Sequence, residues 1–475
     1  MSRYLKPFLF LLIGVKLSAQ EKWDLRKCVD YAVEHNISVK QADLQARFSA
    51  LSLQQSKLSQ YPNLNLSSNV GFSSGRNQDP TSFSLITTGY WSNSYVLQSG
   101  VELFNWFSKK NTVAGNQLDL QASHAGVDKA KNDISLNVAV AYLQVLLARE
   151  QASLSRIQVS QDQKQLESTR LQVDAGKLPE LNAAQLESQL ATDSANLVTS
   201  EANAAQLLLQ LKALLYLDAA LPFDIDAPPV DRIPVLSLAE LQPETVYALA
   251  LVNLPQQRVD DLKIKSSQKL VDAARGAMYP SVSLFGSLGT TYNNKAQEAK
   301  GKATINPPLG KVTVGGTDYQ VYPLQPYDIY TYGSINYFDQ LNQNFRQSVG
   351  LSISVPLFNN GNARVAWERS KLNLRQWQLT RDQDNQTLKQ DIYKAYNDAL
   401  AAMEKFNANK KAVQTAQVAF DYAQKRYDLG LLSIYELITS QTSLLQAKSN
   451  LLYSQYDYVF KMKLLEFYKG QGLQL

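Results

Sequence analysis

The chain has 475 residues, of which 45% are hydrophobic and 19% are charged, and its formal net charge is +5. So small a charge for this length gives no argument for binding nucleic acid. The single cysteine, Cys28, excludes an intramolecular disulfide framework. It shares a predicted helical face with Leu25, Val29 and Ala32, so we expect a small core residue there and not a lipid anchor.

The N-terminal segment, residues 1–19, has the pattern of a secretory signal peptide. Arg3 and Lys6 precede a short apolar run at residues 8–15, and a small-residue cleavage site follows at residues 17–20. The alternative, a buried N-terminal helix, is disfavoured by the positive charges ahead of the run. The run is too short for a transmembrane helix, and no later run approaches the ~20 apolar residues that one needs. We therefore expect an exported mature chain.

Four segments alternate apolar and small polar residues with the period of a β-strand. In residues 63–72, one face carries Leu64, Leu66, Val70 and Phe72. The corresponding positions of the other three segments are Tyr95, Leu97, Val101 and Leu103, then Val282, Leu284 and Leu288, and then, within residues 348–357, Val349, Leu351, Ile353, Val355 and Leu357.

Two features of these strands favour a membrane over a soluble β-sandwich, which would also alternate. Their opposite face is small and uncharged, as the wall of a water-filled lumen would be, and their length fits the ~9–11 residues of a tilted transmembrane strand. Four strands cannot close a barrel, because the smallest outer-membrane barrels have about eight. The chain is therefore expected to oligomerise and so pair its sheet edges.

The connecting segments are predicted to be irregular. Residues 71–93 are rich in serine, threonine and glycine, and residues 290–344 form a longer loop to which we assign no receptor role. Residues 221–243 are rich in proline, which predicts a stiff, largely extended linker. The tyrosines of the longer loop are Tyr319, Tyr322, Tyr327, Tyr330, Tyr332 and Tyr337.

Residues 109–174 and 363–429 each predict one long helix without proline. A helix of about 65 residues is on the order of 100 Å long, which indicates a coiled coil or a helical tube. Both carry a heptad seam of mostly small residues, which lets helices approach closely and suits a curved wall. A generic filamentous coiled coil would explain the heptads but not the strands. The seam positions are Ile134, Val138, Ala141, Val145, Ala148, Ala152, Ser155, Val159, Asp162, Leu166, Thr169 and Val173, and then Leu388, Ile392, Ala395, Ala399, Ala402, Phe406, Asn409, Val413, Ala416, Phe420, Ala423 and Tyr427.

Each long helix ends in a related turn. Residues 173–181 return as residues 427–437, with Gly176 and Gly430 in register (430 − 176 = 254). This indicates two tandem copies of one unit, and glycine where the chain must reverse predicts a left-handed backbone. The second copy has 36 extra residues between its strands, because Tyr61 and Tyr279 are only 218 residues apart (254 − 218 = 36). The predicted division is a signal peptide (1–19), a first repeat (20–220), a linker (221–243), a second repeat (244–470) and a C-terminal tail (471–475).

The sequence contains few residues in patterns that are typical of a catalytic site. His35 and His124 are the only histidines, and no zinc, phosphate-loop or serine-hydrolase motif is present. Both histidines are more typical of polar helix surfaces than of metal ligands. We therefore expect neither an enzyme nor a cofactor or metal site.

Taken together, these features resemble the TolC-like outer-membrane efflux proteins over residues 23–470. The most specific elements are the second tip turn, the fainter first one at residues 170–177, and the repeat openings at residues 32–36 and 250–255. The second turn reads Arg426-Tyr427-Asp428-Leu429-Gly430-Leu431.

The resemblance implies an α+β membrane protein, a tandem-repeat subunit of a trimeric 12-stranded outer-membrane β-barrel that continues as a long periplasmic α-helical coiled-coil tube. It implies the outer membrane of a Gram-negative bacterium, contact with its lipid, a homotrimer, a periplasmic membrane-fusion adaptor, and an inner-membrane pump of the RND or ABC type. The tip residues expected to dock the adaptor are Gly176, Lys177, Leu178, Gly430, Leu431, Leu432 and Ser433.

In this family, acidic residues after the second tip form a ring that narrows the pore. The matching positions here are Glu436 and Thr439, so at most one ring of carboxylates is implied. An equally good interpretation of Glu436 is an exposed acid that favours the start of a helix. The implied function is a passive exit duct of a tripartite efflux or type I secretion system. The alternative is a non-conducting envelope protein, a barrel-anchored coiled-coil spacer.

Overall fold

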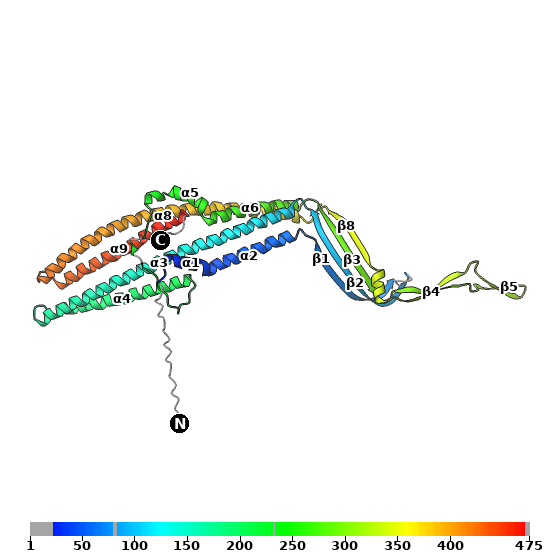
Figure 1. The fold of residues 1–475 in the computed structure, drawn as a ribbon, viewed down its shortest axis with the longest axis horizontal. Coiled ribbons are helices and arrows are strands. Elements are labelled where there is room, and N and C mark those ends of the chain that lie inside the picture. The colour runs from blue at the N-terminus through cyan, green and yellow to red at the C-terminus, as the bar shows by residue number, and fades with distance from the viewer. Residues whose placement is uncertain (1–21, 79–82, 228, 231–232, 471–475) are drawn as a thin grey trace, which may run out of the picture. The chain divides into compact units, whose positions relative to one another are not determined.

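The computed structural model describes residues 22–78, 83–227, 229–230 and 233–470. The expected signal peptide and C-terminal tail lie outside the described residues. The chain divides into two compact units. The helical unit contains residues 1–51, 116–267 and 373–475, and the sheet unit contains residues 52–115 and 268–372 (Figure 1). Among the described helices, none is both long enough and apolar enough to cross a membrane.

The helices come in matched pairs, one member from each half of the chain. The first half contains α1 (Leu25–His35), α2 (Ile37–Leu58), α3 (Ser108–Asp174) and α4 (Glu180–Leu214). The second half contains α5 (Pro243–Asn253), α6 (Pro255–Gly276), α8 (Asn362–Asp428) and α9 (Ile434–Tyr468). The lengths agree pair by pair, at 11, 22, 67 and 35 residues. The two long helices and the tandem repetition predicted from the sequence are confirmed.

The two heptad seams are covered unequally within one chain. On α3, every seam residue from Ile134 to Thr169 is buried. On α8, the seam is buried at Ile392, Ala395, Ala399, Ala402 and Tyr427, whereas the positions between Phe406 and Ala423 are half-buried. The same sequence pattern therefore leaves the tip-side half of α8 more open than its counterpart on α3.

The linker contributes to the core, which its proline content did not predict. Ile225 is fully buried and forms a parallel bridge with Trp23, and Leu241 is fully buried in the short 3-10 helix η2 (Leu238–Leu241). Arg149 on α3 pairs with Asp224 and donates a hydrogen bond to the carbonyl oxygen of Ile225 at 3.2 Å. Partial burial would raise the pKa of Asp224, but the Arg149 hydrogen bond and charge outweigh it and hold that pKa below its usual range.

Cys28 is a core residue, as predicted. Its side chain is fully buried in a cluster with Leu25, Ala32, Val138 and Tyr142. Burial, together with the negative charge of Asp24, raises the pKa of the thiol to about 12. A thiol that stays protonated is a poor nucleophile, so this cysteine is an inert packing group.

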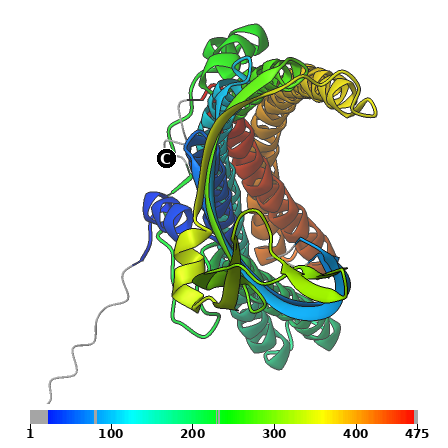
Figure 2. The ribbon, with the colours of Figure 1, turned by 90° about the vertical axis from the view of Figure 1, so that its right-hand side faces the viewer.

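The sheet unit contains one antiparallel four-stranded sheet in the order β1-β2-β3-β8. Its register confirms the predicted apolar face, because Leu97 lies opposite both Leu66 and Leu288, and Leu284 lies opposite Leu351. The sheet is curved (Figure 2), and β1 and β8 have no partner on their outer edges among the described residues. The strands are β1 (Asn63–Gln78), β2 (Leu85–Phe104), β3 (Ser281–Asn293) and β8 (Arg346–Ser354).

One prediction about this sheet was wrong at its margin. The last strand ends at Ser354, so Val355 and Leu357 lie beyond it; Pro356 has no N–H to continue a ladder. Tyr95 lies on the same face as Leu97, as predicted, and its hydroxyl lies 3.0 Å from that of Tyr337 on the small helix α7 (Tyr337–Gln343).

The segments predicted as loops are largely strands. Residues 71–78 pair with residues 85–92 and extend the first hairpin. Threonine and aromatic residues in β2 suit a pleated strand, and cross-strand pairing outweighs the loop-like serine and glycine content. The longer segment forms two ladders, β4 with β7 and β5 with β6. Their bounds are β4 (Gln297–Ile305), β5 (Gly310–Val314), β6 (Thr317–Val321) and β7 (Tyr327–Ser334).

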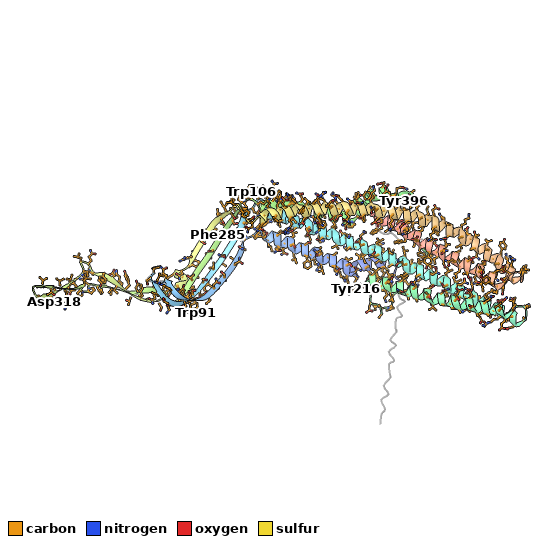
Figure 3. The ribbon with its side chains drawn as sticks, turned by 180° about the vertical axis from the view of Figure 1, so that it is seen from behind. Trp91, Trp106, Tyr216, Phe285, Asp318 and Tyr396 are labelled. Carbon is orange, nitrogen blue, oxygen red and sulfur yellow. The ribbon has the colours of Figure 1, made fainter. Side chains whose placement is uncertain are left out.

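The two ladders form an exposed ribbon that ends near Asp318, while Trp91 and Trp106 mark the opposite ends of the sheet (Figure 3). Tyr330 and Tyr332 are exposed on the ribbon. A Lys302–Asp328 ion pair of 2.8 Å joins its two strands.

The assignment of faces is testable with two neighbouring substitutions in β8. Leu351 belongs to the exposed apolar face and Ser352 to the small polar face. An arginine on the lipid side near the bilayer midplane costs about 2–4 kcal/mol, whereas one on the lumen side stays hydrated. We expect Leu351→Arg to reduce folded protein in membrane fractions strongly, and Ser352→Arg to reduce it little. Equal losses for the two variants would show that the faces are assigned wrongly.

Candidate functional site at the hairpin tips

Two helical turns lie at the same end of the helical unit, one between α3 and α4 and one between α8 and α9 (Figure 1). Gly176 and Gly430 occupy them with φ of +72° and +74°. The left-handed backbone predicted at both glycines is confirmed. Only glycine adopts this conformation without strain from a Cβ atom, which explains why it recurs in both copies.

Both turns use the same backbone hydrogen bonds. In the first, the N–H groups of Gly176 and Lys177 donate to the carbonyls of Val173 and Gln172, each at 2.8 Å. In the second, Gly430 and Leu431 donate to Tyr427 and Arg426, also at 2.8 Å. This pattern is a Schellman motif, which satisfies the last carbonyls of the helix while the chain reverses. Each tip is therefore a tightly defined turn and not an open loop.

A small apolar cluster beneath the tips joins the two hairpins. Its buried members come from all four long helices, and Thr169 on α3 lies 3.4 Å from the hydroxyl of Tyr427 on α8. Because one cluster serves both turns, movement of one hairpin disturbs the packing of the other. The buried residues of the cluster are Leu166, Ala183, Leu186, Tyr427, Ile434 and Leu437.

The residues predicted at the tips divide into exposed and packed ones. Gly176, Lys177, Gly430, Leu431 and Ser433 are exposed. The two remaining predicted residues, Leu178 and Leu432, are half-buried, and Leu432 packs against the cluster beneath the tips. The turns therefore present five exposed predicted residues, while Leu432 also contributes to the packing beneath the second turn.

Several exposed apolar side chains beside the turns were not singled out from the sequence. The sequence pattern that could have identified them is an apolar residue that lies outside the heptad seam and close to the end of a helix. Exposed apolar side chains that gather at one end of a molecule are typical of interaction sites. They are Leu171 and Leu181 at the first tip, and Tyr422, Leu429 and Tyr435 at the second.

Glu436 closes a capping box at the start of α9. Its carboxylate accepts hydrogen bonds from the Ser433 N–H at 3.0 Å and from the Ser433 hydroxyl at 2.7 Å. These bonds lower the pKa of the exposed Glu436 carboxyl, so it stays ionised at neutral pH. Thr439 is exposed, and its hydroxyl donates to the carbonyl of Tyr435 at 2.8 Å. In the first copy the equivalent of Ser433 is Pro179 (433 − 254), so only the second tip carries the box.

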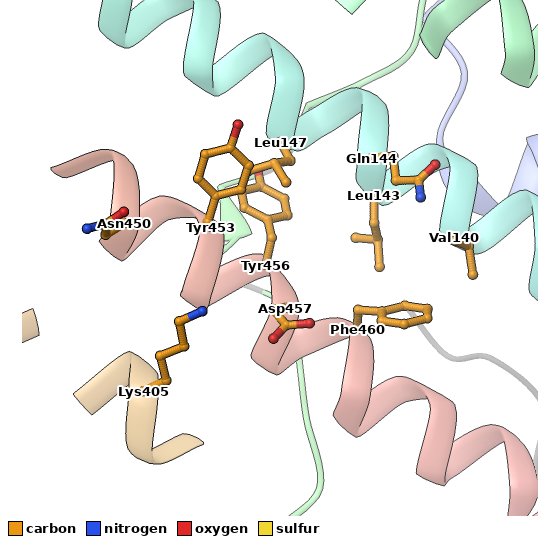
Figure 4. A pocket seen from close by; sticks show the side chains of 10 residues that line it. All are labelled: Val140, Leu143, Gln144, Leu147, Lys405, Asn450, Tyr453, Tyr456, Asp457 and Phe460. Atoms are coloured by element: carbon orange, nitrogen blue, oxygen red, sulfur yellow. The ribbon is translucent and has the colours of Figure 1, made fainter. Parts of the chain in front are cut away.

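The helical unit also contains a cavity of about 580 Å³ between α3, α8 and α9. Leu143 and Leu147 of α3 face Tyr456 and Phe460 of α9 across it, and Lys405 of α8 lies at its edge (Figure 4). Within the described part of the chain, no group of three or more His, Cys, Asp or Glu side chains could hold a metal ion.

The arrangement of paired helical hairpins and a four-stranded antiparallel sheet is that of a solved outer-membrane protein. The structure of VceC from Vibrio cholerae matches 95% of this chain and 97% of that chain with a TM-score of 0.73, at 16% identity. The family model for outer membrane efflux proteins matches residues 31–215 and 246–468. The chain therefore belongs to the outer membrane efflux protein family, whose members are channel proteins of the cell outer membrane of Gram-negative bacteria and not enzymes.

Curated relatives are distant in sequence. Outer membrane protein TolC of Escherichia coli is 25% identical over 114 residues, which are 24% of this chain and 23% of that protein. The outer membrane efflux protein BepC of Brucella suis is 20% identical over 368 residues, which are 76% of this chain and 69% of that protein. The chain thus matches about a quarter of the length of TolC and about two thirds of the length of BepC.

The backbone requirement at the second tip can be tested with a matched pair of substitutions. Gly430→Val places a β-branched side chain at φ +74°, where it is strained, whereas Gly430→Asn introduces a residue that tolerates this region. We expect faster hydrogen exchange around residues 425–435 in the valine variant and near wild-type exchange in the asparagine variant. Wild-type exchange rates in both variants would show that the turn does not require glycine at this position.

Proposed function

We propose that the protein is the outer-membrane exit duct of a tripartite efflux or type I secretion system, formed by three copies of the chain. The observation that carries this proposal is a curved four-stranded sheet with an exposed apolar face, whose outer strands β1 and β8 have no further partner among the described residues. Lipid leaves no water to satisfy an open edge, so each edge requires a strand from another chain. Three copies would give a closed 12-stranded barrel, which is within the observed range of outer-membrane barrels.

The helices next to the sheet edges support the same assembly. On α2, which precedes β1, exposed apolar residues recur every seventh position, at Ile37, Leu44, Leu51 and Leu58. On α8, which follows β8, the same spacing recurs at Val365, Leu372 and Leu379. A heptad stripe of apolar residues favours packing against a partner helix, because that removes the stripe from water. Pairing of α2 with α8 of a neighbouring chain would cover both stripes and continue the β1–β8 pairing into a helical tube.

The two repeats, residues 20–220 and 244–470, would then alternate around the barrel and the tube, joined by the linker at residues 221–243. The half-buried seam on the tip-side half of α8 supports this arrangement, because a neighbouring chain would complete its burial.

The hairpin tips are the proposed docking site for a periplasmic membrane-fusion adaptor, which would link the duct to an inner-membrane pump of the RND or ABC type. Defined turns flanked by Leu171, Leu181, Leu429 and Tyr435 offer apolar anchors of the kind that dominate protein interfaces. The docking residues proposed are Gly176, Lys177, Leu178, Gly430, Leu431, Leu432 and Ser433.

Glu436 is the proposed constriction residue, with Thr439 one helical turn beyond it. Three copies would place three ionised carboxylates near the tip, and the Ser433 hydrogen bonds keep each one charged. The capping role and the constriction role are compatible, since the carboxylate accepts hydrogen bonds from one residue only and remains exposed.

The rival function is a barrel-anchored spacer that conducts nothing. Purified protein reconstituted into planar bilayers separates the two functions. A duct is expected to show discrete single-channel conductance, and a Glu436→Gln variant should shift its cation selectivity or gating. Correctly assembled trimers without any conductance steps, in both the wild type and the variant, would favour the spacer.

The helical part of the assembly can be tested at the α2 stripe. Leu51→Glu adds a charge within the stripe, and Gln45→Glu adds the same charge at an exposed position about 100° round the helix from the stripe. Because a buried unpaired carboxylate is costly, we expect the first variant to lower the thermal stability of the oligomer and the second to leave it near wild type. Native mass spectrometry in detergent against temperature gives the measurement. A stable wild-type monomer, or identical behaviour of both variants, would contradict the proposed interface.

A further inference from the structure

Two aspartates are buried against each other inside the first helical hairpin. Asp162 on α3 has 1% of its surface exposed and Asp193 on α4 has 5%. Asp162 occupies a heptad seam position, where the second copy has Ala416 (162 + 254), and the position equivalent to Asp193 is Ala447 (193 + 254). The pair is therefore a feature of the first hairpin alone. Carboxylates are almost never fully buried unless something compensates their charge.

The hydrogen bonds around the pair leave one oxygen without a donor. Asp162 Oδ1 accepts from Gln158 Nε2 at 2.8 Å and from Gln441 Nε2, on α9, at 2.6 Å. Asp162 Oδ2 is buried and receives no N–H or O–H from any of the described residues. Asp193 lies opposite Asp162 in the register of the hairpin, because Ser155 and Ser200, each seven residues away, have their hydroxyls 3.4 Å apart. The oxygens of Asp193 accept from Gln189 at 2.8 Å and from Asn196 at 3.4 Å.

Two ionised carboxylates have only acceptors, so they cannot hydrogen-bond to each other. One proton placed between them turns one carboxyl into a donor, satisfies the orphan oxygen and removes one of two buried like charges. The α3–α4 ion pairs Arg156–Glu201 and Arg170–Glu187 lie six and eight positions away along α3 and are exposed, so both arginines are engaged elsewhere.

We infer that Asp162 and Asp193 share one proton. This proton holds α3 against α4 and keeps Gln441 of the second hairpin hydrogen-bonded to Asp162. The packing between the two hairpins near the tips is therefore sensitive to pH. The site is built within one chain, so it does not depend on how many chains assemble or on whether they conduct.

The direction of the pH effect follows from the surroundings. Burial is the largest cause that raises the pKa of Asp162, the adjacent Asp193 raises it further, and the hydrogen bonds from Gln441 and Gln158 lower it, leaving it at about 7. A carboxyl whose pKa is raised by folding stabilises the packed hairpin fully below its ordinary pKa near 4. That stability is lost progressively as the pH rises to about 7, and two buried negative charges then face each other.

Hydrogen exchange of the full-length protein in detergent at pH 5.5 and pH 8.5, corrected for the intrinsic chemical rate, tests this inference. In the wild type we expect peptides covering residues 155–200 to exchange at least about tenfold faster at pH 8.5, because a pKa raised from 3.8 to about 7 allows a change of that size over this pH interval. Peptides of α8 covering residues 400–420 provide an internal control, because they exclude Gln441 and carry Ala416 in place of Asp162.

Asp162→Asn is the decisive variant. Its amide nitrogen donates permanently to Asp193, and its amide oxygen still accepts from Gln158 and Gln441. We expect this variant to lose the pH dependence of exchange, and infrared titration to show one fewer protonated carboxyl near neutral pH. Glu187→Gln, which removes an exposed carboxylate of the same hairpin, should retain the wild-type profile.

Three results would overturn the shared proton. They are equal pH dependence in the wild type and Asp162→Asn, no pH dependence in either, or loss of the effect in Glu187→Gln as well. If Asp162→Asn does not assemble, Asp193→Asn provides the same test from the α4 side.

Discussion

The open edges of the four-stranded sheet constrain the rest of the molecule. Among the described residues, the outer edges of β1 and β8 have no partner strand and lie beside an apolar face. Lipid cannot satisfy the backbone N–H and C=O groups of such an edge. The order β1-β2-β3-β8 also decides which helices lie at the margins, because α2 leads into β1 and α8 follows β8. In the proposed assembly, one neighbouring chain would cover both the exposed heptad stripe of a helix and the strand edge beside it.

The tips obey a different constraint, since there each hairpin must reverse within a few residues. The Schellman turns satisfy the ends of α3 and α8, and the shared apolar cluster beneath them couples the two hairpins. Farther from the tips than this cluster, the two copies differ: the first hairpin buries the pair Asp162 and Asp193, and the second has Ala416 and Ala447 at the equivalent positions. A duct built from such subunits would have tips that are similar in backbone but different in chemistry.

Much of this was readable in the sequence, because local periodicity determines it. The strand faces around Leu66 and Leu351, the long helices, and the left-handed glycines at 176 and 430 follow from spacing alone. The extended first hairpin and the β4–β7 ribbon were missed, because pairing between distant strands overrides a loop-like composition. Asp162 stands among the seam positions but was not singled out, because its partners Asp193 and Gln441 lie on other helices, which only the folded chain brings together.

A single-particle structure of the full-length protein in lipid nanodiscs tests the central claim most directly. The account predicts three chains in which β1 of each chain is hydrogen-bonded to β8 of the next, with α2 and α8 in contact along their stripes. A folded monomer, or an oligomer in which these two edges remain unpaired or meet other elements, would contradict it.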